Sequence, residues 1–225
     1  MISANKKSPV IALDGPGASG KGTLGRRIAK ELGLQYLDTG KLYRVVGYKF
    51  INGKYSIDDL INKSVDAQKE AHDISENINV EELDNEELLT EKVARAASYV
   101  SSIPEVRSAL LDFQRDVANS PSGAVLDGRD IGTVICPDAD FKFFITADVE
   151  KRAERRYKEL QKEDDSIIYA DILEDLRNRD RRDTEKAISP LTPADDSVHI
   201  DTTSLSMENV YNKVMSIILS ETSDK

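Results

Sequence analysis

A glycine-rich segment directly after a short apolar run is the feature that most narrows the folds open to this chain. The apolar run is Val10–Leu13, and the segment Gly15–Thr23 follows it. Glycine adopts positive φ without steric cost, so such a segment can curl and direct successive backbone N–H groups toward one point. From Lys21 to Leu32 the apolar residues recur at helical spacing, and Gly33 stands where helix ends favour glycine. Strand, loop and helix in this order predict the opening of a βα unit.

The loop is suited to bind a polyphosphate. Its N–H groups and the positive end of the following helix favour an anion, and Lys21 supplies a mobile charge for the β- and γ-phosphates. Gly22 separates the lysine from Thr23, the hydroxyl that we expect near Mg²⁺. The segment Asn62–Val65 does not complete a guanine-selecting Asn-Lys-x-Asp motif, so ATP is favoured over GTP. The residues expected to hold ATP here are Gly15, Gly17, Ala18, Ser19, Gly20, Lys21, Gly22 and Thr23.

Similar apolar runs recur along the chain and alternate with helical patterns. Further strands are expected at Ala124–Leu126, Phe141–Thr146 and Val198–Asp201, and Leu37–Gly40 is interpreted as a polar turn. Helices are expected at Tyr43–Phe50, Glu91–Val100, Glu105–Ala118, Glu150–Lys162, Ala170–Arg182 and Met207–Leu219. This alternation predicts an α/β fold with a parallel, doubly wound sheet.

Two segments interrupt the alternation. Residues 61–91 are rich in acidic side chains and indicate a solvated helical excursion, and residues 151–186 are dense in charges of both signs. We therefore expect one unit with a core at 8–60, 92–150 and 187–225. The segment at about 61–91 would be an inserted piece, and the segment at about 151–186 would be a lid.

Composition bounds the class of protein. The net charge of −10 over 225 residues argues against nucleic-acid and anionic-membrane partners, which need a cationic face. The single cysteine, Cys136, permits no disulfide framework, and no apolar run is long enough for a signal peptide or a membrane helix. A cytoplasmic monomer is the expectation. His72 and His199 have no partner at ligand spacing in the sequence and are expected to be structural or solvated.

A second group of charged residues follows the strand that ends near Leu126. Asp127 is placed as an acid that holds Mg²⁺ through water, Arg129 can offer a planar fork to a phosphate, and Asp130 can accept a hydrogen bond. Arginines recur at 152–156 and 177–182. Most of these charges fit a solvated helix, but a set of arginines around two phosphorylated ligands is also what phosphoryl transfer requires.

With these motifs, the sequence resembles the bacterial cytidylate kinases, which are P-loop nucleoside monophosphate kinases. The matching blocks run in order over almost the whole chain, and Gly128–Val134, reading Gly-Arg-Asp-x-Gly-Thr-Val, is the most specific of them. The others are Ile11–Pro16, Gly20–Thr23, Leu37–Gly40 with Tyr43-Arg44, Ala96–Ser98, Pro104–Arg107, Phe141–Phe144, Arg179–Asp183, Pro190-Leu191 and Asp201–Thr203. The resemblance implies a P-loop kinase fold, with a five-stranded parallel sheet and helices on both faces. It also implies transfer of a phosphoryl group from ATP to CMP or dCMP in pyrimidine metabolism, with Mg²⁺.

The resemblance also implies roles for individual residues. Thr39, Arg107 and Asp130 would read the cytosine. Ser98, Arg179 and Asp183 would hold the ribose. Arg44, Arg129 and Lys186 would hold the acceptor phosphate. Lys21, Arg129, Arg152 and Arg156 would act on the transferring group, and Thr202 would lie near the adenine.

The sequence departs from the family pattern in three places. Ala18 stands where the family usually has glycine, Lys186 stands where it has arginine, and residues 61–91 are short and lack a clear strand hairpin. Two alternatives stay open at this level. One is a kinase for another small acceptor, such as UMP, AMP or shikimate, and the other is a non-catalytic ATP switch.

Overall fold

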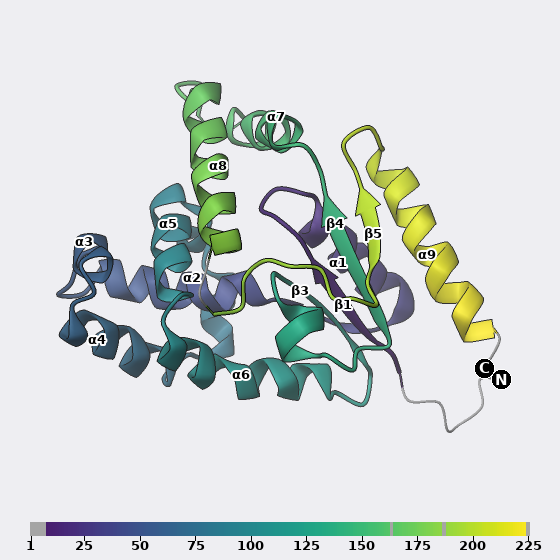
Figure 1. Ribbon diagram of the computed structural model, residues 1–225, viewed down its shortest axis with the longest axis horizontal. Helices are drawn as coiled ribbons and strands as arrows, with labels where there is room; N and C mark the ends of the chain where they lie inside the picture. Colours follow the sequence, from purple (N-terminus) through teal and green to yellow (C-terminus); the bar gives the residue numbers. More distant parts are fainter. Residues whose placement is uncertain (1–7, 163, 186–187, 224–225) are drawn as a thin grey trace. The chain divides into compact units, whose positions relative to one another are not determined.

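The structure, a computed structural model that describes residues 8–162, 164–185 and 188–223, contains a five-stranded parallel sheet (Figure 1). Its order is β2-β3-β1-β4-β5. The chain passes from β1 toward β2 on one side and later reaches β4 and β5 on the other, which confirms the expected doubly wound topology. The strands are β1 (Val10–Asp14), β2 (Gln35–Asp38), β3 (Ala124–Gly128), β4 (Phe141–Thr146) and β5 (Val198–Asp201).

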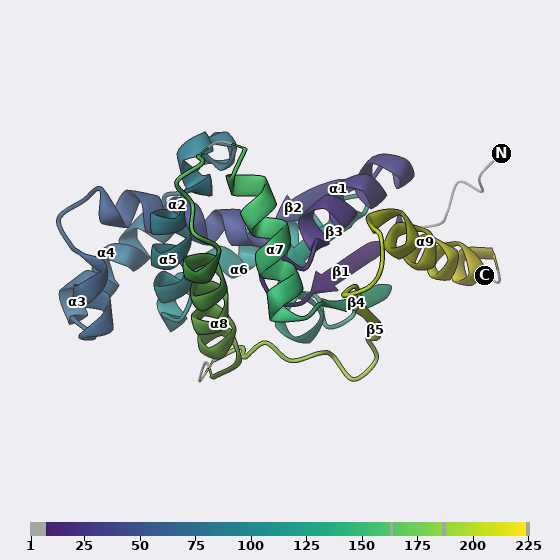
Figure 2. The ribbon, with the colours of Figure 1, turned by 90° about the horizontal axis from the view of Figure 1, so that it is seen from above.

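The chain divides into two compact units, and the first contains most of the sheet. Within the described part of the chain, this unit comprises residues 8–37, 118–162, 164–185 and 189–223. Its helices are α1 (Lys21–Leu32), the short π-helix η3 (Ile131–Ile135), α7 (Val149–Leu160), α8 (Tyr169–Glu185) and α9 (Met207–Ser223). The helices α7 and α8 lie side by side in both views (Figure 1 and Figure 2).

The core of the first unit lies between one face of the sheet and the helices α1 and α9. Ile11 and Leu13 point to this face because alternate residues of a strand point the same way. They pack with Ile28 of α1 and Val214 of α9, all of which are fully or almost fully buried. A separate apolar cluster of Ala153, Ile172 and Leu176 joins α7 to α8.

The second unit consists mainly of Asp38–Val117 and is helical. Its elements are α2 (Thr39–Ile51), α3 (Ile57–Ile61), α4 (Val65–Ser75), the 3₁₀ helices η1 (Val80–Asp84) and η2 (Glu86–Leu89), α5 (Glu91–Val100) and α6 (Pro104–Ala118). Gly47 of α2 lets the backbone approach α5, since a Cβ atom there would lie 2.8 Å from the backbone nitrogen of Ala97. The described residues of the segment 61–91 lie in this unit and form no strand.

The expectation of a polar turn at Leu37–Gly40 was wrong. Residues Gln35–Asp38 form β2 next to β3 at the edge of the sheet, and α2 begins at Thr39 rather than near Tyr43. Only Leu37 of this strand is buried. A short edge strand with one buried side chain gives no apolar run, so its sequence looks like a turn.

Within the described part of the chain, every helix is too short or too polar to cross a lipid bilayer.

Gly15, in the loop after β1, and Gly33, at the end of α1, should differ strongly in how much a substitution by alanine destabilises the fold. A Cβ atom on Gly15, whose φ is +145°, would overlap the carbonyl oxygen of Ile145 in β4, whereas a Cβ atom on Gly33, whose φ is +68°, meets nothing within 4 Å. Gly33→Ala should lower the free energy of unfolding by about 1–2 kcal/mol, the cost of a left-handed alanine. Gly15→Ala should lower it by about 3 kcal/mol or more, because overpacking adds to backbone strain. Urea unfolding measures both values. Equal losses would contradict the tight contact between the loop and β4.

Candidate active site

The loop between β1 and α1 is shaped by residues with positive φ. These are Gly15 (φ +145°), Ala18 (φ +58°) and Gly20 (φ +94°). Gly20 is the N-cap of α1 and offers no capping side chain, and the first helical bond runs from the N–H of Leu24 to its carbonyl. The N–H groups of the first turn therefore have no partner within the helix and suit an anion.

Ala18 keeps the left-handed conformation although it carries a Cβ atom. Its side chain packs against the apolar cluster of Ala153, Ile172 and Leu176 in α7 and α8. The loop thus accommodates alanine where the resemblance expects glycine, and the added methyl group contacts the helical hairpin.

The ammonium group of Lys21 is buried within its own loop, with 4% of the residue exposed. Nζ donates to the carbonyl oxygen of Pro16 (2.9 Å) and to Oγ of Ser19 (3.3 Å), and it lies 3.8 Å from Oδ1 of Asp127. Burial lowers the pKa of Lys21 to about 8, and the nearby Arg129 adds to this effect. The loop therefore holds an ammonium group in a fixed position, and this group loses its proton more readily than an exposed lysine does.

Asp127 lies at the carboxyl end of β3, beside the start of α1. Its Oδ2 accepts a hydrogen bond from the hydroxyl of Tyr36 (3.3 Å) and lies 3.4 Å from the position of a Cβ atom on Gly22. The residue is almost fully buried. A carboxylate at this point, with the hydroxyl residue Thr23 in the first turn, provides the oxygen donors that Mg²⁺ prefers.

Two arginines lie over the loop and share one carboxylate. Asp183 of α8 accepts a hydrogen bond from Nε of Arg129 (2.9 Å) and lies 3.9 Å from Nε of Arg179. A Cβ atom on Gly17 would lie 3.5 Å from one nitrogen of Arg129 and 3.6 Å from one of Arg179. Arg129, Arg179 and Lys21 thus converge on one loop of an acidic protein. Such a cluster is suited to an occupant with several negative charges.

The arginines of α7 point in different directions. Arg152 is buried, and it donates from Nε to the carbonyl oxygen of Ala147 (2.8 Å) and from a terminal nitrogen to that of Gly17 (3.1 Å). Its two terminal nitrogens also bind Asp180 of α8 at 3.1 and 2.5 Å. Arg156 donates to Glu159 (3.1 Å) at the surface. The structure therefore places Arg152 as a brace between the loop, α7 and α8.

A small pocket adjoins the loop. Arg155 donates to Oγ1 (3.0 Å) and to the carbonyl oxygen (2.6 Å) of Thr202, whose hydroxyl in turn donates to Thr146 (3.0 Å). The walls combine loop backbone, these two polar residues and apolar side chains, which suits a flat, mostly apolar group next to a polyphosphate. The lining residues are Ser19, Gly20, Leu24, Ile145, Arg155, Thr202, Leu205, Met207 and Val210.

The second unit carries its own group of expected site residues. Thr39 and Ser98 are buried. Arg44 donates to the carbonyl oxygen of Leu88 (2.5 Å), and Arg107 donates to that of Ser101 (3.1 Å). The guanidinium of Arg107 also lies 5.7 Å from the ring centre of Tyr43. Lys186 lies outside the described residues.

Sequence reasoning assigned no role to Asp14, which directly precedes the loop, or to Asp180, which pairs with Arg152. Asp14 is almost fully buried and accepts hydrogen bonds from the N–H groups of Ile131 (2.8 Å) and Gly132 (2.7 Å). Burial raises its pKa to about 6, although these two bonds oppose the shift. The sequence does contain one signal for Asp14, because it is an acidic residue at the end of an apolar run.

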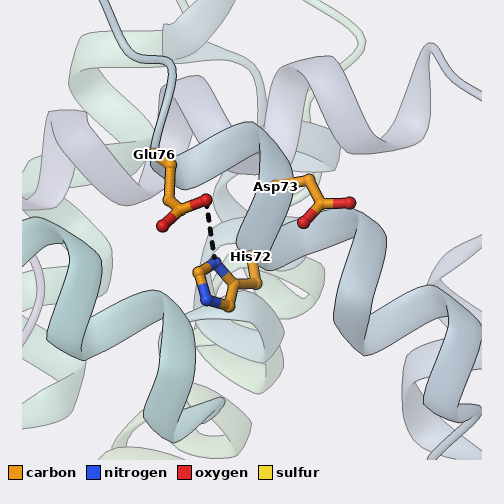
Figure 3. Close-up of side chains that lie close together, drawn as sticks. All are labelled: His72, Asp73 and Glu76. Carbon is orange, nitrogen blue, oxygen red and sulfur yellow. Dashed lines mark ion pairs between the residues drawn. The ribbon is translucent and has the colours of Figure 1, made fainter.

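Another cluster of possible metal ligands lies on α4, in the second unit (Figure 3). Nδ1 of His72 lies 3.9 Å from Oε2 of Glu76, and Asp73 completes a group whose ligand atoms lie within 4.8 Å of one another. His72 thus has close acidic neighbours, contrary to the expectation from the sequence. Both carboxylates are exposed, and the His72–Glu76 spacing is typical of side-chain pairs on a solvated helix.

The fold and the loop together define a P-loop phosphotransferase. A glycine-rich loop follows the central strand of a doubly wound parallel sheet, and three cations meet over it. Comparison with known proteins then narrows the class. Residues 11–220 match the family model described as cytidylate kinase, and the chain belongs to the cytidylate kinase family.

Individual relatives agree with this assignment. The chain is 49% identical to the cytidylate kinase of Paramagnetospirillum magneticum over 94% of this chain and 98% of that protein. It is 47% identical to the cytidylate kinase of Azorhizobium caulinodans over 93% and 97%. A crystal structure of an uncharacterized protein from Eubacterium ventriosum shares the fold, with a TM-score of 0.53 and 13% identity over 95% of this chain and 99% of that one.

The buried lysine predicts that ATP affinity depends on pH. Because the pKa of Lys21 is lowered to about 8, its charge is present below pH 8 and is lost above it. The dissociation constant for ATP should therefore rise by about tenfold between pH 7 and pH 9. Calorimetric titration measures this change. Lys21→Arg serves as the control, since a guanidinium keeps its proton over this range. A dissociation constant for ATP that does not change with pH in the unaltered protein would contradict the lowered pKa of Lys21.

Proposed function

We propose that the chain transfers the γ-phosphoryl group of ATP to CMP or dCMP, giving ADP and CDP or dCDP. The observation that carries this proposal is the convergence of Lys21, Arg129 and Arg179 on the phosphate loop. A switch protein needs one phosphate site, whereas a transferase must stabilise charge on two phosphorylated ligands. Membership of the cytidylate kinase family supports the choice of acceptor.

ATP would occupy the loop and the adjoining pocket. The N–H groups of the loop and the start of α1 would bind the phosphates, with Lys21 near the β- and γ-phosphates. The pocket beside Thr202 and Arg155 would receive the adenine. The residues assigned to ATP are Gly15, Gly17, Ala18, Ser19, Gly20, Lys21, Gly22, Thr23 and Thr202.

Mg²⁺ would be held by Thr23 and, through water, by Asp127. The buried carboxylate of Asp127 and the hydroxyl of Thr23 belong to neighbouring elements and offer hard oxygen donors, so the residues fit this ion. When bound, Mg²⁺ neutralises phosphate charge during transfer.

The residues proposed for the acceptor nucleotide have three roles: reading the base, holding the ribose and holding the phosphate. In the first unit, Asp130 would read the base, Arg179 and Asp183 would hold the ribose, and Arg129 would hold the phosphate. In the second unit, Thr39 and Arg107 would read the base, Ser98 would hold the ribose, and Arg44 would hold the phosphate. Lys186 is proposed as a further phosphate ligand. A cytosine edge needs both a donor and an acceptor opposite it, and these are the roles proposed for Arg107 and Asp130.

The reaction needs alignment and charge stabilisation more than a basic side chain, because the attacking group is already a phosphate oxygen. Arg129 and Lys21 would stabilise the transferring group directly. The remaining proposed contributors, Arg152 and Arg156, are braced by Asp180 and Glu159 respectively. We also propose that residues 151–186 act as a lid that excludes water from the transferring group. The segment 61–91 would support the acceptor side.

We further propose a cytoplasmic monomer that binds neither nucleic acid nor membranes. The net charge of −10 and the single cysteine support this proposal.

Acceptor preference provides the direct test of the function. ADP release is measured by a coupled assay with Mg-ATP and, in turn, CMP, dCMP, UMP, AMP, GMP and shikimate. We expect fast turnover with CMP and dCMP and little with the purines. Turnover confined to another acceptor would contradict the roles of Arg107 and Asp130. Absence of ADP release with every acceptor would favour a non-catalytic ATP switch.

Removing one cation should separate transfer from ATP binding. Arg129→Ala is expected to lower kcat by about two to three orders of magnitude, since charge on the transferring group loses a fixed donor. ATP affinity, measured by calorimetric titration, should change little because the loop and Lys21 remain. The matched control is Arg177→Ala, which removes an exposed arginine of α8 that pairs with Glu150. Loss of ATP binding in Arg129→Ala would show that this arginine serves ATP instead.

A further inference from the structure

The carboxylate of Asp14 bonds to a segment that lies far away in the sequence. Asp14 ends β1 and points to the sheet face opposite Leu13. Its two oxygens accept from adjacent backbone N–H groups, Oδ1 from Ile131 (2.8 Å) and Oδ2 from Gly132 (2.7 Å). Gly132 permits this approach, because a Cβ atom there would lie 3.3 Å from Oδ2. A buried carboxylate with two donors is satisfied, so the contact is a built feature of this part of the fold.

These N–H groups belong to the first turn of η3, which has no cap of its own. The N-cap residue is Asp130, and its side chain makes no capping hydrogen bond. The first N–H groups of a helix need a partner from outside the helix. Asp14 provides that partner across 117 residues of sequence for Ile131 and 118 for Gly132.

Asp14 also fixes the other end of the same bend. Its backbone is paired with Gly128 in the register of β1 and β3. Asp14 therefore lies beside Gly128 in the strand ladder and binds Ile131 and Gly132 by its side chain. The two residues between these anchors are Arg129 and Asp130.

We propose that Asp14 is a positioning residue for phosphoryl transfer, which clamps the bend that presents Arg129 and Asp130 to the acceptor nucleotide. This role rests on the proposed function, because Arg129 and Asp130 are assigned there to the acceptor phosphate and base. Arg129 lies over Gly17 of the phosphate loop, and Asp14 stands immediately before that loop. The clamp thus ties the geometry of the acceptor side to that of the ATP side through one side chain.

Asp14→Asn tests the clamp with little change of volume. Asparagine keeps one acceptor but turns an NH₂ group toward a backbone N–H, so one of the two bonds is lost. We expect kcat/KM for CMP to fall by about a hundredfold, as for a misplacement of about 1 Å. The loss of ATP affinity should be clearly smaller. Amide hydrogen exchange at Ile131 and Gly132 should become faster, which reports on the clamp without any turnover.

Two further variants separate positioning from folding and from charge. Gly132→Ala leaves the carboxylate of Asp14 in place but adds a Cβ atom 3.3 Å from its Oδ2 and 3.2 Å from Cδ of the flexible Lys142 side chain, and it should produce a smaller loss of the same kind, about tenfold. Asp140→Asn makes the same chemical change at the other end of β1, where a single oxygen, Oδ2 of Asp140, accepts from the N–H of Val10 (2.8 Å) and the amide oxygen of asparagine can keep that one bond. It should leave the KM for CMP and kcat unchanged.

The outcomes distinguish the proposal from the function on which it rests. Wild-type turnover is measured first, and absence of turnover with cytidine nucleotides would overturn the proposed function itself. Normal wild-type turnover with an unchanged kcat/KM for CMP in Asp14→Asn and Gly132→Ala would overturn only the role of Asp14. Equal losses of ATP affinity and of kcat/KM for CMP would also overturn it, because Asp14 would then serve the phosphate loop. Should Asp14→Asn fail to fold, Gly132→Ala and its exchange rates decide the question.

Discussion

The charges of one lysine within the phosphate loop and of two arginines beside it are the constraint on which the rest of this structure depends. Lys21, Arg129 and Arg179 repel one another, and the lowered pKa of Lys21 is a direct consequence of its burial and of this repulsion. The cluster persists because carboxylates flank it, with Asp127 beside the lysine and Asp183 between the two arginines. Asp127 and Asp183 therefore help to hold these three cations in place.

The loop itself is shaped from several directions, and none of these contacts is local. Ile145 of β4 excludes any side chain at Gly15, and Arg152 of α7 bonds to the carbonyl of Gly17. Met207, at the start of α9, lies 3.0 Å from the position of a Cβ atom on Gly20. Ala18, which carries a Cβ atom at positive φ, would be strained in isolation. The parallel sheet matters here because it brings β4, α7 and α9 to the end of the strand that carries the loop.

The sequence predicted the elements whose signals are local and missed those that tertiary contacts decide. The helices Lys21–Leu32 and Glu91–Val100 were predicted with the observed bounds, because their apolar spacing is regular. The strand Gln35–Asp38 was missed because it buries a single side chain. In α7, Arg152 and Arg156 are one helical turn apart and look alike in the sequence. One is buried against Gly17 and Asp180, and the other pairs with Glu159 at the surface. Which of two such arginines turns inward depends on α8, whose packing the local pattern does not contain.

The same difference between local and tertiary signals explains why the residues of the phosphate loop stood out in the sequence, whereas the residues that hold them in place did not. Residues that bind a polyphosphate must be of particular chemical types at the loop, so Lys21 and the glycines stand out in a single sequence. Residues that fix those groups need only a suitable donor or acceptor, and Asp14 and Asp180 resemble many other acidic residues of this chain. Preorganised charge acts on a reaction only if it is fixed before the ligand arrives. Asp14 and Asp180 are therefore supports of the site that only the folded structure identifies.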